Sequence, residues 1–420
     1  MPDLSKHMAE ALLYLLHTST TARNRDIIDT AIKLSKRHGS RIFLVGGAVR
    51  DLLLKSEPRD FDFIIETDPR NFANELSGLP GANLSYYEQF KTSTITVDGL
   101  KFDFARARTE TYHKPGVLPT TYDASVEQDL WRRDFPINSI ALELTDVNNP
   151  SIVDPTGGLS DIANRVVRIL HRRSFLDDPT RIFRAIRYEQ RLKFNIDTST
   201  RSLLLKALKA RALSTISSDR TRNEIDLMLD EPERASMFLR ASTLGLLSSI
   251  HSSLLNINWS EYLGKSGEDK LAYLSTMAYK LSPDETNSFI SLINAPKSWA
   301  RVLRDMSYLS EKESILNERS LRPIEVYLLL ENISIHSLNA FKYLTNLEGT
   351  HKNICLYLDE YRDVHPSISS ANLENLGVSK GPDIKIILQK ILARRLDRSI
   401  STLSEEMQLA RAYLKLQKRP

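Results

Sequence analysis

Two aspartates two positions apart are the first residues of this chain whose types and spacing could do chemistry. Asp60 and Asp62 alternate with Phe61 and Phe63, and residues two apart in a strand face the same side. Close carboxylates repel each other unless a cation lies between them, and Mg²⁺ takes oxygen ligands while leaving room for substrate phosphates. The pattern predicts a divalent-metal site; the alternative is an edge strand with solvated acids.

A third carboxylate, Asp103, lies between Phe102 and Phe104 in another alternating segment. If this strand lies beside the first, three carboxylates converge. That arrangement suits two-metal phosphoryl transfer, in which one ion activates an attacking hydroxyl and the other holds the triphosphate and leaving group. Taken alone, Asp103 is also explained as an ordinary polar residue of a strand.

A glycine pair, Gly46 and Gly47, follows an apolar segment and precedes a helix start that contains Arg50. Glycines let the backbone approach a ligand closely, and amides at a helix N-terminus point at anions. The pair with Arg50 therefore predicts a phosphate contact, and the alternative is a tight turn without a ligand.

Arg133, Asp134 and Asn138 form a second polar group, in which the aspartate and asparagine are four residues apart. A polar face of this kind could reach the phosphates and sugar of a nucleotide. The alternative is a run of solvated charges at a helix start. We interpret Arg132 in this second way, as a solvated charge.

A cationic stripe follows Pro179, because Arg181, Arg184 and Arg187 are three residues apart. Asp178 precedes Arg181 by the same spacing, and an acid beside a guanidinium can hydrogen-bond the edge of a base while further arginines hold phosphates. A salt-bridged surface helix is the alternative.

The periodicity of apolar residues predicts the elements that must position these side chains. Residues 1–38 read as two helices, and short β-rich runs follow at 42–45, 61–65, 92–97, 101–104 and 140–144, with a helix after Pro69. From about residue 175 the spacing is helical, with breaks near Pro232, Pro283, Pro296, Pro323 and Pro366. The fold class is therefore predicted to be α+β, with a mixed-sheet head followed by an all-α remainder.

Composition bounds the class of protein. A chain of 420 residues, with 41% hydrophobic and 26% charged residues, is typical of a soluble multidomain protein. The single cysteine, Cys355, excludes an intramolecular disulfide and any multi-cysteine metal site, and a reducing cytoplasm is the expected setting. No apolar run is long enough to predict a membrane segment. The nine histidines lie at least ten residues apart and none precedes an aspartate, so no His-Asp metal site is expected.

The net charge of +4 hides a strong segregation of charge. Residues 172–222 hold ten Arg and three Lys against five acids, and residues 384–420 hold nine basic against three acidic residues. The segment 39–168 is acidic instead, with 14 basic and 19 acidic residues. The two basic segments suit the phosphates of a nucleic acid.

In this order, the motifs resemble the tRNA nucleotidyltransferases (CCA-adding enzymes) of the bacterial and eukaryotic class, which share their head with bacterial poly(A) polymerases. The resemblance runs through residues 46–51, 60–62, 132–138, 154–161 and 177–181, and weakly through 218–224. It implies a polymerase-beta-type head, then a helical neck, body and tail that hold the acceptor arm of tRNA. The implied domains are an N-terminal extension 1–38, head 39–168, neck 169–238, body 239–365 and tail 366–420.

The resemblance also implies an activity: CMP and AMP from CTP and ATP are added to the tRNA 3′ end, with Mg²⁺ as cofactor and release of pyrophosphate. No protein partner is implied. Asp60 and Asp62 would be the Mg²⁺ ligands and Asp103 the acid that helps activate the primer hydroxyl. The implied nucleotide contacts are Gly46, Gly47, Arg50, Arg133, Asp134, Asn138, Arg184 and Arg187, with Asp178 and Arg181 as the pair that reads the base.

The sequence departs from the family pattern at three places, of which the third bears on specificity. Asp177 replaces the usual Glu, Pro136 replaces a Thr, and residues 114–119 occupy the place of the flexible loop that governs the switch from C to A addition. An A-adding or CC-adding enzyme of the same family is therefore an alternative. A poly(A) polymerase is another, although residues 88–97 resemble the tRNA-directed branch. A non-catalytic RNA-binding module is disfavoured by the three carboxylates.

Overall fold

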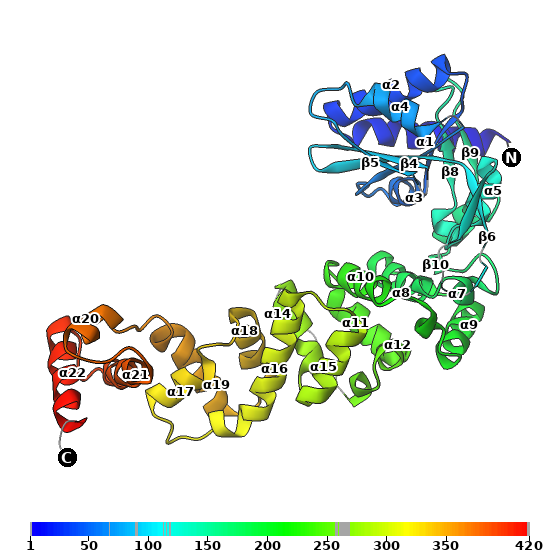
Figure 1. The fold of residues 1–420 in the computed structure, drawn as a ribbon. Helices are drawn as coiled ribbons and strands as arrows, with labels where there is room; N and C mark the ends of the chain where they lie inside the picture. Colours follow the sequence, from blue (N-terminus) through cyan, green and yellow to red (C-terminus); the bar gives the residue numbers. More distant parts are fainter. Residues whose placement is uncertain are drawn as a thin grey trace. The chain divides into compact units, whose positions relative to one another are not determined.

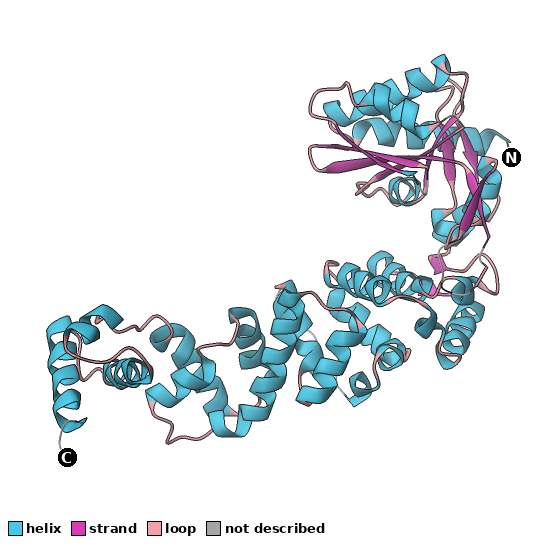
Figure 2. Cartoon of the chain, in the orientation of Figure 1, coloured by secondary structure: helices cyan, strands magenta, loops and turns pink. Residues whose placement is uncertain are grey.

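The computed structural model describes residues 2–66, 68–88, 91–111, 113–114, 116, 119–256, 259 and 269–417. The chain forms two compact units, Met1–Ile250 and His251–Pro420 (Figure 1). The predicted α+β class is confirmed: the first unit holds a mixed sheet with helices, and the described residues of the second unit form helices (Figure 2). Within the described ranges, no helix has the length and apolar character needed to cross a membrane. The finer domain boundaries remain a proposal.

A seven-stranded sheet is the centre of the first unit. Its order is β3 (Asn83–Tyr87), β4 (Thr92–Val97), β5 (Leu100–Arg106), β2 (Phe61–Ile65), β1 (Ile42–Val45), β8 (Ala141–Glu143) and β9 (Ser151–Val153). Neighbouring strands are antiparallel except β2 and β5, which are parallel and place Asp62 directly opposite Asp103. The sheet thus brings Asp62 and Asp103 together, which the sequence predicted only on the condition that their strands are neighbours.

One face of the sheet is apolar and is covered by helices. Phe61 stacks on Phe102 and Phe63 on Phe104 across the β2–β5 pair, with ring centroids 5.1 and 5.0 Å apart. The helices α1 (Pro2–Thr18), α2 (Ala22–Arg37) and α4 (Pro69–Leu76) contribute to the same core (Figure 1). Each large side chain buried here stabilises the fold by about 1.5–3 kcal/mol. The two predicted N-terminal helices are therefore part of the core of the head.

The opposite face carries the polar residues, because successive side chains of a strand alternate between faces. Asp62 lies on this face with Ile64, which packs in a smaller cluster with Phe43 and Val45. Helix α5 (Val126–Trp131) buries Val126 and Leu130 in the same cluster. The apolar part of this face is thus covered by one short helix.

The remaining elements of the first unit are short and mostly helical. They are α3 (Gly47–Leu53), β6 (Arg108–Thr111), β7 (Thr120–Asp123), η2 (Pro136–Asn138), α6 (Gly158–Ala163), β10 (Val166–Val167), α7 (Ser174–Asp177), α8 (Thr180–Leu192), β11 (Asn195–Ile196), α9 (Thr198–Lys209), η3 (Ala212–Thr215), α10 (Ser218–Leu229), α11 (Arg234–Thr243) and α12 (Leu246–Ile250). The parallel β10–β11 pair was not predicted, since two residues are too few for an alternating pattern.

In the described part of the second unit, helices begin where the prolines predicted breaks. Pro283 and Pro323 are the first residues of the helices Pro283–Leu292 and Pro323–Leu330, and Pro296 is the N-cap residue of the helix Lys297–Leu316. Proline suits the start of a helix because the amide that it lacks would be unpaired there. The elements are η4 (Ser252–Asn256), α14 (Lys270–Ser275), η5 (Thr276–Ala278), α15 (Pro283–Leu292), α16 (Lys297–Leu316), α17 (Pro323–Leu330), α18 (Ile335–Leu344), α19 (Glu348–Leu356), the π-helix η6 (Tyr357–Tyr361), α20 (Ser370–Asn375), α21 (Pro382–Leu396) and α22 (Leu403–Gln417).

Candidate active site

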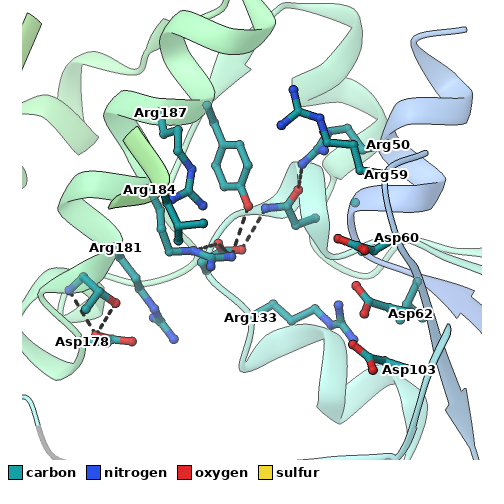
Figure 3. Close-up of a pocket in the computed structure, with 18 of the residues that line it drawn as sticks. Arg50, Arg59, Asp60, Asp62, Asp103, Arg133, Asp178, Arg181, Arg184 and Arg187 are labelled. Atoms are coloured by element: carbon teal, nitrogen blue, oxygen red, sulfur yellow. Dashed lines mark hydrogen bonds and ion pairs between the residues drawn. The ribbon is translucent and has the colours of Figure 1, made fainter. Parts of the chain in front are cut away.

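Three carboxylates lie along one side of a pocket of about 810 Å³ in the first unit (Figure 3). Asp62 comes from β2, Asp103 from the neighbouring β5, and Asp60 from the turn that precedes β2. Asp60 is therefore not itself in the strand, although its side chain lines the same pocket. The parallel register of the two strands is what brings the residues together.

The surroundings of Asp62 and Asp103 disfavour the charged forms of these two side chains. Burial, together with the charges of Asp103 and Asp60, raises the pKa of Asp62 to about 6, against the opposing effect of Arg133. Burial likewise raises the pKa of Asp103, although the Thr94 hydroxyl donates a hydrogen bond to its carboxylate. Ionised carboxylates held this close require a nearby cation.

A divalent ion fits this donor set. In the described residues, no group of three His, Cys, Asp or Glu side chains is arranged to enclose a metal ion. Mg²⁺ is commonly held by only one or two carboxylates, with substrate phosphates and water as the other ligands. The oxygen-only pair Asp60 and Asp62, open to a pocket, meets that requirement.

We predict that Asp62→Asn stabilises the metal-free protein at neutral pH. The pKa of Asp62 is about 6 in the folded chain, above the usual value of 3.8, so its ionisation destabilises the fold as pH rises through this window. The asparagine side chain does not ionise, so the substitution removes this destabilisation. We expect a melting temperature about 2–4 °C above that of the wild type at pH 7.5 in EDTA, corresponding to about 1 kcal/mol.

Thermal unfolding at pH 7.5 and at pH 4 tests this prediction. At pH 4 the wild-type carboxyl is largely protonated and the difference should disappear. Glu57→Gln, at an exposed acid of the same connection, is the control and should change neither value. An equal difference at both pH values would contradict the assigned cause.

Gly46 lies directly against the acids. Its φ of 74° and ψ of −135° favour glycine, and a Cβ there would lie 3.0 Å from Arg133 Nη1 and 3.2 Å from Asp62 Oδ2. Gly47 begins α3, and Arg50 on this helix is buried, donating hydrogen bonds to Asp51 and Asn138. The glycine turn therefore gives the backbone close access to the side of the pocket that holds the carboxylates.

A hydrogen-bonded chain joins Arg50 to α8. Asn138 accepts from Arg50 at 2.5 Å and donates to Asp134 Oδ1 at 3.1 Å, while Arg184 Nε donates to Asp134 Oδ2 at 2.7 Å. Burial by itself would raise the pKa of Asp134, but Arg184 and Asn138 outweigh it and keep the pKa below its usual value. Asp134 is thus a charged centre that fixes its neighbours.

The implied base-reading residues lie on the side of the pocket away from the carboxylates (Figure 3). Asp178 Oδ1 accepts from Thr180 Oγ1 at 2.7 Å and from Arg220 Nη2 at 2.7 Å. Arg181 donates to Ser174 Oγ at 2.7 Å and to the Arg132 carbonyl at 3.1 Å. The side chains of Asp178 and Arg181 are therefore each held in place by their own hydrogen-bond partners.

Comparisons with known proteins identify relatives of this chain. Residues 42–168 match the poly(A) polymerase head domain. The A-adding tRNA nucleotidyltransferase of Geobacter sulfurreducens is 32% identical over 88% of this chain, which spans only 44% of that relative's length. The A-adding tRNA nucleotidyltransferase of Halalkalibacterium halodurans is 28% identical over 96% of both chains. The solved structure of the Thermotoga maritima CCA-adding enzyme complexed with tRNA is 25% identical, with a TM-score of 0.72 over 96% of this chain and 98% of that one.

Residues 42–168 therefore carry a poly(A) polymerase head domain, and the chain is similar to tRNA nucleotidyltransferases. The predicted recognition is thereby confirmed at the level of the family. The roles of individual residues remain proposals.

Several residues that line the pocket were not among the site residues predicted from the sequence. Arg59, Tyr188, Arg191, Arg220, Glu224 and Glu231 all line the pocket. Arg191 lies four residues after Arg187, one helical turn beyond the cationic stripe, and Arg220 and Glu224 fall in the weakly matching segment, so a signal was present for these three. Neither Tyr188 nor Glu231 carried one.

Charge in this pocket is balanced, because nine arginines and nine carboxylates line it. Eight of the arginines have a carboxylate partner within ion-pair distance. Within the part of the chain that the structure describes, Arg181 alone of the nine forms no ion pair. Arg181 and the three carboxylates are therefore the charges that a ligand can still neutralise.

Our interpretation of Arg132 as a solvated charge is wrong. Asp129 is fully buried and accepts from Arg132, which also pairs with Glu110 and donates to the Arg108 carbonyl. Burial acts to raise the pKa of Asp129, but Arg133 and Arg132 outweigh it and lower the pKa. This cluster holds the β6–β7 hairpin against α5.

The segment that takes the place of the family's flexible loop is only partly described. Pro115, Val117 and Leu118 lie outside the described residues, as do Gln89 and Phe90 of the segment compared with poly(A) polymerases. Gly116 donates to the Asp177 carbonyl at 3.2 Å and accepts from Arg220 Nη1 at 2.9 Å. Arg220 thus contacts both this segment and Asp178.

Proposed function

We propose that this chain transfers nucleoside monophosphates from CTP and ATP to the 3′ end of tRNA and releases pyrophosphate. The observation that carries the proposal is a single pocket with three carboxylates on one side and an unneutralised Arg181 on the other. A metal-dependent transfer centre and a base-binding group face the same space. The similarity to a CCA-adding enzyme over nearly the whole chain supports complete CCA addition.

Addition of A alone is a second candidate. Two relatives of this chain are A-adding enzymes, and one of them aligns over 96% of both chains. The three carboxylates and the arginines would serve either reaction, because the two differ only in which bases are accepted.

In the proposed reaction, the two sides of the pocket have separate tasks. Asp60 and Asp62 would hold Mg²⁺, which when bound supplies charge neutralisation at the phosphates and a lower pKa for the attacking hydroxyl. Asp103, on the adjacent strand, would accept the proton of that hydroxyl. Asp178 and Arg181 would bind the edge of the incoming base, so that side chains replace a nucleic acid template.

Arginines and basic segments would bind the remaining parts of the substrates. Arg50, Arg133, Arg184 and Arg187 would contact the nucleotide with Gly46, Gly47, Asp134 and Asn138. The basic segments 172–222 and 384–420 would contact phosphates of the tRNA acceptor arm. We place the reaction in the cytoplasm, where tRNA is processed and Cys355 stays reduced.

Product sequencing tests the proposal. We would supply tRNA ending at the discriminator base, ending in CC, or complete, with CTP, ATP or both. Addition of CCA to the first substrate is the expected result, and addition of one A only to the CC-ended substrate would select the second candidate. Repeated A addition would indicate a poly(A) polymerase, and addition to none of the three would contradict the proposal.

A further inference from the structure

Tyr188 is the aromatic residue around which the arginines of the pocket gather. It lies on α8 after the cationic stripe, and only 7% of its surface is exposed. Its ring meets Phe135 edge-on with centroids 5.6 Å apart, so packing from the head fixes the ring plane. Arginine side chains lie around the same ring.

Four guanidinium groups lie within contact distance of this ring. The Cζ atoms of Arg50, Arg191, Arg184 and Arg187 are 5.1, 5.2, 5.7 and 6.0 Å from the ring centroid. Arg184 Nη2 also donates to the Tyr188 hydroxyl at 3.2 Å. One side chain therefore contacts arginines from both α3 and α8.

The polar partners of these arginines neutralise them but link them only in pairs. Arg50 pairs with Asp51, Arg184 with Asp134, Arg187 with Glu224 and Arg191 with Glu231. Glu231 also lies 3.8 Å from Arg187 Nε, and Asn138 joins Arg50 to Asp134, so these partners link the arginines in pairs, whereas the ring is common to all four. The negative face of an aromatic ring attracts cations by about 0.5–2 kcal/mol each, more when the site is desolvated.

We propose that Tyr188 is a positioning residue that sets the spacing of these arginines for the phosphates of the incoming nucleotide. The inference rests on the proposed function, because the ligand is a nucleoside triphosphate. Tyr188 acts through its neighbours: its ring presents Arg50 and Arg184 to the pocket, and removal of the ring leaves the four guanidinium groups linked only in pairs by their polar partners.

The test compares variants at position 188 by steady-state kinetics and by calorimetric titration of ATP without tRNA. We expect Tyr188→Leu to raise both KM and Kd for ATP about tenfold with kcat within about threefold. Tyr188→Phe, which loses one hydrogen bond but keeps the ring, should restore both to within about threefold of the wild type. Pentafluorophenylalanine at position 188, similar in shape to Phe but with a reversed ring quadrupole, should behave like the leucine variant.

Phe183→Leu is the matched control. Phe183 is buried on the same helix but does not line the pocket, so it should lower stability without changing KM. Unchanged KM and Kd in Tyr188→Leu would overturn the proposal, as would equal values for Phe and pentafluorophenylalanine. If the wild type incorporates no nucleotide, the proposed function fails, whereas the ATP titrations still decide the role of Tyr188.

Discussion

Replacing Asp60 by asparagine is expected to lower nucleotide incorporation into tRNA by about 10³-fold or more, because the metal ion that we propose at this site would contribute several kcal/mol to stabilisation of the transition state. Asp60 is exposed at the pocket and lies outside the strand, so the amide should leave the fold intact. Single-turnover incorporation of AMP into CC-ended tRNA measures the effect, and tRNA binding measured separately should be unchanged.

Glu57→Gln is the matched control, because it removes a negative charge from the same connection, three residues earlier, at an exposed position. It should incorporate nucleotide at the wild-type rate. Undiminished incorporation by Asp60→Asn would refute both the metal site and the proposed transfer reaction. A comparable loss in both variants would indicate a general effect of charge.

Replacing Arg181 by lysine is expected to weaken discrimination among nucleotides by about 10- to 100-fold. Lysine keeps the positive charge but loses the planar fork that can make two hydrogen bonds to a base edge, and a bidentate contact of this kind contributes about 1–3 kcal/mol to discrimination. The ratio of kcat/KM for ATP to that for GTP on CC-ended tRNA measures the effect. The rate with ATP should fall less than the ratio, because phosphate contacts do not depend on Arg181.

The control for Arg181 is Arg173→Lys in the preceding turn. The Arg173 side chain is 70% exposed and pairs with Asp177, so its replacement should leave the ratio unchanged. An unaltered ratio in Arg181→Lys would remove this residue from base recognition. Ser174, which accepts a hydrogen bond from Arg181 at 2.7 Å, could then be examined as part of a purely structural contact.

Most of what could be predicted about the fold came from the local pattern of apolar and polar residues. Alternation around Asp62 and Asp103 predicted two half-buried strands, and both exist. Their parallel pairing was left conditional, because partners in a sheet are chosen by contacts between distant segments. The same reason explains the two-residue β10–β11 pair, which forms between segments on either side of α7 and α8.

The sequence predicted the site residues whose type implies a chemical role. It did not predict the residues whose role depends on their neighbours in the fold. Asp60, Asp62, Asp103 and Arg181 do line one pocket. Arg132 was misjudged, because its partner Asp129 is buried, which a charge run in the sequence does not reveal. Tyr188 had no signal at all, since an aromatic residue on an amphipathic helix is indistinguishable from core until its neighbours are known.

The parallel pairing of β2 with β5 also determines when during folding the site is completed. Helix α4 and strands β3 and β4 lie between these strands in the chain, whereas β3, β4 and β5 follow one another and pair with their neighbours. Local pairings close quickly, and a pairing across a long connection must first overcome the entropy of closing that loop. We therefore expect Asp62 and Asp103 to meet after the local strands have paired, so that an intermediate with only those pairings would have native hairpins but no centre able to bind a divalent ion.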